Sequence, residues 1–311
     1  MNNSPLVSII IITYNSSGYV LETLESALAQ TYPNIEIIIS DDCSNDSTLD
    51  VCKKFLSGCE NRLREKVTIL SSAYNTGISG NCNRGLNAAK GEWIKIIAGD
   101  DILSASAISD YVEYVEKRPG VKHLIAKSEW FRGPFDFSKT FKPKPQSMYP
   151  FLESTSQKKQ FSIITKVFFG SGPTYFASSE ALRNVGGFDE RFPMQEDYPL
   201  FIKMIASGYK MHYLDKVTVY HRVHDMSISN EKEECAIFSR NQVRMIMDYE
   251  YEYRKEHLIG LWLFFHNYSL SLQKLIVKNG NSKKSIICMF LKIIYTLTDP
   301  FVWYARMLSV K

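Results

Sequence analysis

The sequence predicts an α/β protein with a mostly parallel sheet flanked by helices, followed by a helical C-terminal region. Three observations support this prediction. Short apolar runs rich in β-branched residues alternate with segments of helical spacing, polar residues follow the apolar runs, and the last part of the chain reads as helix throughout. A chain of 311 residues with 45% hydrophobic content can also bury a sizeable core.

Four short apolar runs predict the strands of the sheet. They are nearly continuous in apolar residues, as expected for strands covered on both faces. They lie at 7–13, 35–40, 67–70 and 93–98. Between them, 18–30, 47–56 and 79–89 carry apolar residues at helical spacing.

The middle of the chain is less regular. Residues 120–175, rich in Phe, Lys and Pro, predict a long excursion with hairpin character, of the kind that often carries function. Helices are predicted next at 179–185, closed by Gly186 and Gly187, and at 196–207. A strand is predicted at 216–223.

From residue 231 onward the sequence predicts helices, with a break at 279–284. We therefore predict two regions, an α/β domain at 1–230 and a helical region at 231–311. Polar residues interrupt the apolar stretches near the C-terminus, so no membrane-spanning helix is expected.

Composition excludes several classes of protein. The formal net charge is only +4, well short of the basic surface that nucleic-acid binding usually requires, so nucleic acid is not an expected partner. The six cysteines form no CxxC pair, which predicts reduced thiols in the cytoplasm rather than a zinc site or a disulfide framework.

Polar pairs follow three of the predicted strands. Tyr14 and Asn15 follow the first, while the pairs 41–42 and 100–101 are adjacent carboxylates at the ends of two others. Ligands of open α/β sheets bind beyond the carboxyl ends of the strands. These residues are therefore the first candidates for a binding site.

Four ordered pieces of sequence resemble the inverting glycosyltransferases of family 2, whose nucleotide-binding fold is called GT-A. The pieces are VSIIIITYN (7–15), SDDCSNDS (40–47), GEWIKIIAGDD (91–101) and GGFDERFPMQEDYPLFIKM (186–204). The resemblance covers roughly 5–230. It implies a GT-A fold for the first domain and transfer of a sugar from a nucleotide donor.

The resemblance implies a divalent cation, Mn²⁺ or Mg²⁺, because the departing diphosphate carries negative charge that a cation offsets. Hard carboxylate oxygens suit these ions. By resemblance Asp101 is the direct ligand, and Asp100 contacts the ribose or a metal-bound water. By the same resemblance His224 completes the metal shell and Arg222 pairs with the diphosphate, and a structural role for His224 is an equal alternative. The alternative for the acidic pair is an Asx turn that caps the next helix.

A second group of residues is predicted to bind the nucleotide. Tyr14 is expected to lie against the base, and Asp42 to accept a hydrogen bond from the uracil imide, which favours a UDP-sugar. The alternatives are an ordinary strand-end aromatic for Tyr14 and an N-cap of the following helix for Asp42. A cation for the phosphates is expected from Arg84, although a solvated helix-face arginine is an equal alternative. The predicted nucleotide-binding residues are Thr13, Tyr14, Asn15, Asp41, Asp42, Asn83, Arg84, Asp100 and Arg222.

The acceptor hydroxyl must lose its proton to a base as it attacks the anomeric carbon. By resemblance Asp197 is this catalytic base, and Glu196 is its neighbour or a sugar contact. The alternative is a pair of acids that merely favour a helix N-terminus. No QxxRW sequence follows, which indicates addition of a single sugar rather than processive synthesis.

The tail at 255–311 is basic, aromatic and apolar, a composition that suits the surface of an anionic bilayer. Packing on the first domain or pairing of two subunits as a homo-oligomer is the alternative. Membrane contact at the inner face of a bacterial plasma membrane fits a saccharide acceptor linked to undecaprenyl diphosphate, as in O-antigen or capsule synthesis.

Two positions depart from the family pattern. Ala98 replaces the first acid of the commoner acidic sequence, and Cys82 replaces an arginine. A catalytically silent protein that binds a sugar or a partner is therefore the alternative function. A dinucleotide-dependent oxidoreductase is disfavoured, because the first strand leads into TYNSSG rather than GxGxxG.

Overall fold

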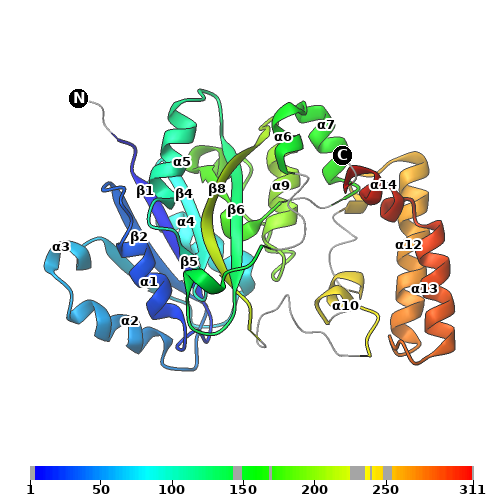
Figure 1. Ribbon diagram of the computed structural model, residues 1–311, viewed down its shortest axis with the longest axis horizontal. Helices are drawn as coiled ribbons and strands as arrows, with labels where there is room; N and C mark the ends of the chain where they lie inside the picture. Colours follow the sequence, from blue (N-terminus) through cyan, green and yellow to red (C-terminus); the bar gives the residue numbers. More distant parts are fainter. Residues whose placement is uncertain are drawn as a thin grey trace. The chain divides into compact units, whose positions relative to one another are not determined.

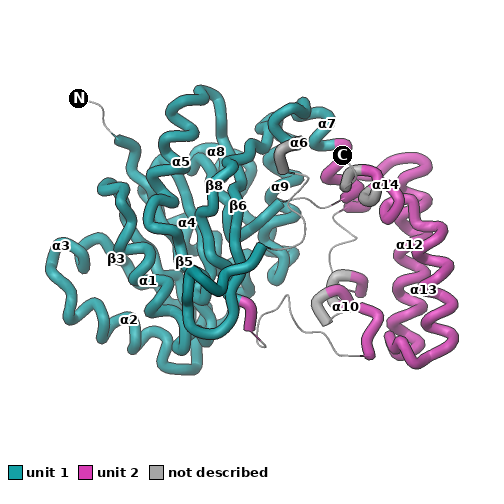
Figure 2. Tube along the Cα trace, in the orientation of Figure 1, with its two compact units in different colours: residues 1–161, 169–222 teal, residues 162–168, 223–311 magenta. Residues whose placement is uncertain are grey.

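A computed structural model describes residues 4–142, 149–167, 170–224, 235–238, 240–247 and 254–309. The chain forms two compact units (Figure 2). The first holds residues 1–161 and 169–222, and the second holds 162–168 and 223–311. The boundary predicted near 230 lies outside the described residues.

The first unit is built around an eight-stranded sheet in the order β3-β2-β1-β4-β7-β6-β8-β5 (Figure 1). Neighbouring strands among β1 to β4 run parallel, and so do β6 and β8. Strand β7 pairs antiparallel with β4 and β6, and β5 pairs antiparallel with β8. The mostly parallel sheet and its first four strands are therefore confirmed. The strands are β1 Val7–Thr13, β2 Ile35–Asp41, β3 Val67–Ser71, β4 Trp93–Ala98, β5 Ile102–Leu103, β6 His123–Phe131, β7 Phe176–Ser178 and β8 Met211–Arg222.

Helices cover both faces of this sheet (Figure 1). Side chains alternate along β1, so Ile9 packs in one core layer with Leu24, while Ile10 faces Gly85 on the other side. The helices are α1 Val20–Leu28, α2 Thr48–Ser57, α3 Asn61–Arg64, α4 Gly77–Ala88, α5 Ala107–Glu116, α6 Tyr149–Ser154, α7 Gln157–Ile164, α8 Ser179–Asn184 and α9 Asp197–Ala206, with 3₁₀ turns η1 Phe137–Lys139 and η2 Gly172–Thr174.

The predicted irregular excursion at 120–175 is wrong in part. It contains β6, which runs parallel to β8 and antiparallel to β7 inside the sheet. It also contains α6 and α7. Among the described residues of this range, an isolated antiparallel bridge joins Trp130 and Phe141, in keeping with the predicted hairpin character. The strand was hidden in the sequence because its apolar run is short and continues into Lys127 and Ser128.

The second unit is helical in its described part, as predicted. Its helices are α10 Arg240–Met247, α12 Gly260–Lys278, α13 Ile286–Thr298 and α14 Pro300–Ser309. The predicted break is confirmed by Gly280 and Asn281, which have positive φ values of 92° and 50°. Within the described ranges, no helix is both long and apolar enough to cross a membrane.

Candidate active site

The carboxyl ends of β1, β2 and β4 lie together because these strands are parallel neighbours. Thr13 lies beside Asp41 in the register, and Ile12 lies beside Ala98. Asp100 lies two residues beyond the end of β4 at Ala98. The fold therefore brings the predicted strand-end residues to one edge of the sheet, which is the usual ligand site in open α/β folds.

The carboxylate of Asp41 is fully buried and bonded within the chain. Its Oδ1 accepts hydrogen bonds from the hydroxyls of Thr13 at 2.8 Å and Ser44 at 2.6 Å, and its Oδ2 accepts from the Ser44 amide at 2.9 Å. Asn15 has a positive φ of 50° and donates its amide to the Ser44 Oγ at 2.8 Å. These bonds hold the loops after β1 and β2 in one arrangement.

The carboxylate of Asp42 is also buried and bonded within the chain. It accepts from the Thr76 hydroxyl at 2.6 Å and amide at 2.9 Å, and it pairs with Arg84 at 3.1 Å. Arg84 also donates to the Asp41 carbonyl at 3.1 Å and the Asn81 side chain at 2.9 Å. The solvated interpretation of Arg84 is therefore wrong, and its contact with phosphate stays a prediction, as does the uracil contact of Asp42.

Two further predicted nucleotide residues lie in different environments. The Tyr14 side chain is 49% exposed beyond β1, where its ring can meet a ligand. Asn83 instead bonds the backbone of Phe188 in both directions at 2.9 Å and donates to Glu190 at 2.7 Å. Gly187 has a φ of 65°, and a Cβ there would lie 2.6 Å from the Asn83 Oδ1. Asn83 thus holds the loop that precedes α9.

The acidic pair after β4 has two different environments. Asp100 is partly exposed, whereas Asp101 is fully buried. The Asp101 Oδ1 accepts from the Arg222 amide at 2.9 Å and lies 2.8 Å from the His221 Nδ1. Its Oδ2 has no hydrogen-bond partner in the described part of the chain. Burial alone would lower the pKa of His221. The negative charges of Asp101 and Asp100 and the hydrogen bond to Asp101 together outweigh burial, so the pKa of His221 is raised above its ordinary value.

Arg222 lies beneath this acidic loop, with a side chain only 2% exposed. It donates to the carbonyls of Asp100 at 2.9 Å and Gly133 at 2.6 Å, pairs with Glu22 at 3.0 Å, and lies 4.5 Å from the centre of the Phe131 ring. This placement makes Arg222 a support of the Asp100 backbone. Its predicted contact with a diphosphate stays a prediction.

The acidic loop fits a divalent cation that also binds diphosphate oxygens. The buried Oδ2 of Asp101 and the partly exposed Asp100 offer hard oxygen ligands, and a cation that shares a diphosphate needs few protein ligands. Among the residues that the structure describes, no group of three His, Cys, Asp or Glu side chains could hold a metal ion. His224 belongs to the second unit, so its role as a third ligand stays a prediction.

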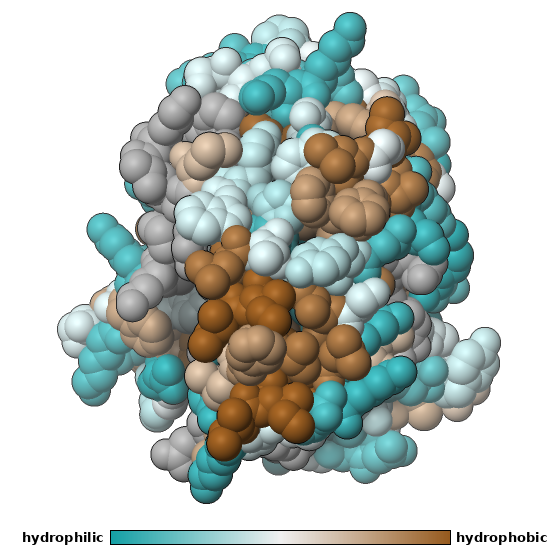
Figure 3. All heavy atoms as spheres, turned by 90° about the vertical axis from the view of Figure 1, so that its right-hand side faces the viewer, coloured by the Kyte–Doolittle hydropathy of each residue, from teal (hydrophilic) through white to brown (hydrophobic). Residues whose placement is uncertain are grey.

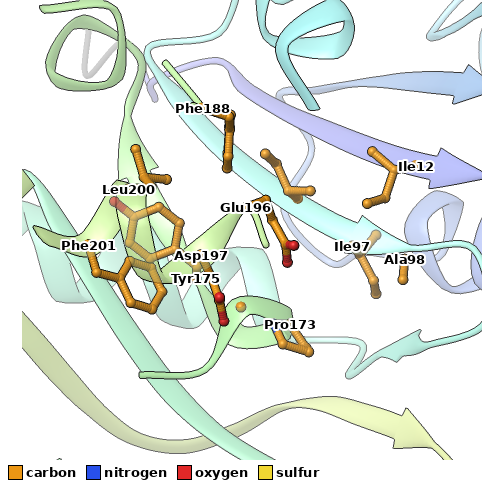
Figure 4. Close-up of a pocket in the computed structure, with 12 residues that line it drawn as sticks. Ile12, Ile97, Ala98, Pro173, Tyr175, Phe188, Glu196, Asp197, Leu200 and Phe201 are labelled. Atoms are coloured by element: carbon orange, nitrogen blue, oxygen red, sulfur yellow. The ribbon is translucent and has the colours of Figure 1, made fainter. Parts of the chain in front are cut away.

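A pocket opens between the end of β4 and the start of α9. It encloses about 460 Å³ of empty space, part of it open to solvent, and Figure 4 shows the carboxylates of Glu196 and Asp197 in a largely apolar lining. The Asp197 carboxylate lies next to the η2 turn at Pro173 (Figure 4). The residues that line the pocket are Ile12, Ile96, Ile97, Ala98, Gly172, Pro173, Tyr175, Phe188, Glu196, Asp197, Leu200 and Phe201.

Both pocket carboxyl groups have raised pKa values. Burial raises the pKa of each above its ordinary value, and the charge of Asp197 raises that of Glu196 further. Backbone N–H groups oppose the rise at Asp197, among them that of Tyr198 at 2.7 Å from Oδ1. These N–H groups stabilise the charged form of Asp197, which suits Asp197 to accept a proton.

Sequence reasoning missed two residues near this pocket, Lys95 and Gly172, and a third, His221, beside the acidic loop. Lys95 is fully buried on β4 and donates to the carbonyls of Ile96 and Pro173, both at 2.5 Å. It thereby ties the η2 turn to the sheet. A Cβ on Gly172 in that turn would lie 3.2 Å from the Asp197 Oδ2. Lys95 could have been noticed in the sequence, because it is a lysine inside an otherwise apolar strand. No feature of the sequence pointed to His221.

The chain has the GT-A fold. TarS 1-349 of S. aureus in complex with UDP-GlcNAc has a TM-score of 0.61 and 19% identity, covering 98% of this chain and 88% of that chain. Mannosyltransferase PcManGT from Pyrobaculum calidifontis in complex with GDP-Man and Mn²⁺ has a TM-score of 0.57 and 15% identity, covering 99% and 85%. These structures confirm the predicted GT-A fold.

Sequence comparison defines the family. The model of glycosyl transferase family 2 matches residues 8–186. The curated UDP-Glc:alpha-D-GlcNAc-diphosphoundecaprenol beta-1,3-glucosyltransferase WfaP of Escherichia coli is 30% identical over 244 residues, which cover 78% of this chain and 86% of WfaP. The chain belongs to glycosyltransferase family 2, and the predicted enzyme class is confirmed.

Proposed function

We propose that this enzyme transfers a single sugar, with inversion, from a UDP-sugar to a hydroxyl of a saccharide linked to undecaprenyl diphosphate. This reaction would serve the synthesis of a bacterial surface polysaccharide, such as O-antigen or capsule, at the inner face of the plasma membrane. The observation that carries the proposal is the pocket in which Glu196 and Asp197 meet the end of the strand that leads into Asp100.

The donor and the acceptor are supported by similar proteins. The name of WfaP specifies UDP-Glc as donor and a diphosphoundecaprenol-linked GlcNAc as acceptor, and the chain matches most of WfaP. TarS was solved with UDP-GlcNAc. PcManGT was solved with GDP-Man, so the fold accepts other bases as well. The exposed ring of Tyr14 offers a stacking surface for a base, and it cannot select uracil by itself.

The chemistry follows from the two sides of the pocket. The acceptor oxygen attacks the anomeric carbon opposite the diphosphate, a new C–O bond forms as the bond to the diphosphate breaks, and the acceptor proton passes to the Asp197 carboxylate. The apolar lining excludes water and keeps the pKa of Asp197 raised, so its carboxylate is a competent base near neutral pH. UDP leaves with the bonding electrons.

A divalent cation held by Asp100 and Asp101, when bound, would offset the charge that develops on the diphosphate. Two observations support the two roles predicted from the sequence. Asp100 is partly exposed and can face the ligand, whereas Asp101 already accepts two hydrogen bonds at Oδ1. We assign Asp101 the direct contact with the cation through Oδ2, and Asp100 the contact with the ribose or a metal-bound water.

The experiment that tests this function is slow donor hydrolysis. The purified chain is incubated with Mn²⁺ and, in turn, UDP-glucose, UDP-GlcNAc and GDP-mannose, and the released nucleotide is measured. We expect release from a UDP-sugar that EDTA abolishes. A catalytically silent binding protein, the alternative raised by Ala98, would bind a nucleotide without releasing its sugar. Release from GDP-mannose alone would contradict the choice of UDP.

A further inference from the structure

The helical hairpin formed by α12 and α13 buries polar side chains and exposes apolar ones, the reverse of the usual arrangement. The helices pair antiparallel, since the hydroxyls of Tyr268 and Thr298 lie 3.1 Å apart and the Cys288 thiol donates to the Ile276 carbonyl. Water-soluble hairpins bury apolar side chains between their helices and expose polar ones. This hairpin buries several polar groups and exposes apolar ones.

Its interior contains a hydrogen-bonded set of polar side chains. The Ser269 hydroxyl donates to the Asp299 carboxylate at 2.6 Å, and the Gln273 amide donates to the Ser269 hydroxyl at 3.1 Å. All three residues are at most 3% exposed, and His266 is 1% exposed. Because these bonds satisfy the buried polar groups, the polar interior is a stable arrangement rather than a defect.

Its exterior carries a continuous apolar stripe. On α13, Ile286, Phe290, Ile293 and Leu297 recur at one helical face and are 53% to 87% exposed. Figure 3 shows a broad hydrophobic area on this side of the molecule. Leu261, Phe264 and Leu275 of α12 are exposed as well. Soluble proteins seldom leave so many neighbouring large apolar side chains in water, so the stripe indicates an apolar partner.

Charge identifies the kind of partner. Residues 257–311 contain seven Lys or Arg and one acid, Asp299, which is buried. Lys278, Lys283 and Lys284 are exposed around the turn that joins the two helices. A second copy of the hairpin would bring these like charges together, whereas an anionic lipid surface attracts them. At about 1.5 Å per residue, the 13 residues of α13 are too short to span a bilayer and suit its interface.

We infer that the exposed face of the α12–α13 hairpin docks on an anionic lipid bilayer, with the apolar stripe in the acyl boundary and the lysines among the headgroups. This inference deepens the proposed function and rests on it in part, because a lipid-linked acceptor lies at such a surface. The hairpin is the enzyme's contact with the membrane, and the pocket of the first unit performs the chemistry.

The test is flotation of the full chain with lipid vesicles, without substrate. One set contains equal parts of phosphatidylglycerol and phosphatidylcholine, and the other contains phosphatidylcholine alone. We expect the chain to float with the anionic set and to float less with the neutral set. The triple variant Ile286→Gln, Phe290→Gln, Ile293→Gln keeps good helix formers at these positions. It should bind the anionic vesicles at least roughly tenfold more weakly than the native chain.

A matched control changes exposed polar positions of the same hairpin. Asn267→Gln with Ser271→Gln leaves the stripe intact and should float like the native chain. Lys283→Gln with Lys284→Gln should weaken binding to the anionic set by roughly fivefold per lysine and leave the neutral set unchanged. Circular dichroism and thermal midpoints establish that each variant is folded.

The inference is overturned if the native chain does not float, or if the triple variant floats equally well. Light scattering tests the alternative partner, a second copy of the chain, by measuring the oligomeric state. If the native chain does not float but forms a dimer, and the triple variant does not dimerise, the stripe would be assigned to contact between two copies. Because flotation needs no donor, its failure leaves the hydrolysis experiment intact. Failure of hydrolysis likewise leaves the membrane result standing.

Discussion

At the scale of single residues, the proposed chemistry depends on which of the two pocket carboxylates accepts the proton of the acceptor hydroxyl. Glu196 and Asp197 are adjacent, so the sequence resemblance alone separates them weakly. The hydrogen bond from the Tyr198 amide stabilises the charged form of Asp197 and so opposes the rise that burial causes in its pKa. Burial keeps both pKa values raised, and the charge of Asp197 raises the pKa of Glu196 further, which makes Asp197 a base of useful strength.

Replacing Asp197 by Asn should therefore reduce turnover by roughly 10²–10⁴-fold, the usual contribution of a general base. UDP binding, measured by calorimetry, should be unchanged. Glu196→Gln is the matched control: it resembles the protonated acid and should retain the larger part of the turnover, with the acid limb of the pH–rate profile still above the ordinary Asp pKa of 3.8. Loss of turnover in Glu196→Gln alone would transfer the role to Glu196.

The acidic loop gives a second prediction at this scale. EDTA should weaken UDP binding, and Mn²⁺ should restore it in the native chain. Asp100→Asn should lose roughly tenfold or more of the gain from Mn²⁺, with a smaller loss of stability than Asp101→Asn. Asp101→Asn should also lower the free energy of unfolding by about 1–3 kcal/mol, since its Oδ1 accepts two internal bonds.

The control for the acidic loop is Asp50→Asn, an exposed acid on α2. It should leave UDP binding, its dependence on Mn²⁺ and stability unchanged. UDP binding that EDTA leaves intact in the native chain would remove the cation from the mechanism. Equal effects of Asn at 100 and 101 on stability would contradict the different environments of the two carboxylates.

At the scale of elements, β4 and the η2 turn are joined by one buried amine. Burial lowers the pKa of Lys95 to about 7, although Asp101 opposes the shift, and the ordinary value is 10.5. Between these two values the unfolded chain binds more protons than the folded one, so the contribution of Lys95 raises the free energy of unfolding as pH rises. The contribution is at most about 1.4 kcal/mol per pH unit.

Lys95→Met should remove this contribution. The difference in free energy of unfolding between the native chain and the variant should increase from about pH 7 toward 10.5, as measured by urea denaturation. Using the difference cancels the titration of other groups. Parallel stability curves for the two proteins would mean that Lys95 keeps its charge in the folded state.

Helix α4 depends on a close approach to β1. A Cβ on Gly85 would lie 2.3 Å from the Ile10 Cγ2, and the same helix carries Asn83 and Arg84. Gly85→Ala should thus cost about 1–3 kcal/mol of unfolding free energy through overpacking. Gly58→Ala, where the nearest atom lies at 3.5 Å, is the control and should change stability by less than about 0.5 kcal/mol. Equal stability of both variants would show that α4 can shift.

At the scale of the whole molecule, much of the first unit could be predicted from local pattern. The strands at 7–13 and 93–98 are apolar runs with polar ends, and their parallel order places the strand-end residues together. Local pattern fails where the deciding contact is distant. The bonds of Asp42 to Thr76 and of Asp101 to His221 join residues that are far apart in the sequence, and so their burial could not be foreseen.

The helical tail shows the same limit in a different form. Its composition predicted a membrane or an oligomer, but only the pairing of α12 with α13 reveals which face is polar. The burial of Asp299 with Ser269 leaves Phe290 and its neighbours outside. Composition reports what a helix contains, whereas its hydrogen bonds decide what it exposes.

The most direct test of the account is the configuration of the product. The donor that the hydrolysis panel selects is incubated with a GlcNAc-diphospholipid acceptor, and the anomeric linkage of the product is determined by NMR. A single attack assisted by Asp197 predicts one added sugar with a configuration opposite to that in the donor, and much slower transfer by Asp197→Asn. A product that retains the donor's configuration, or undiminished transfer by Asp197→Asn, would contradict it.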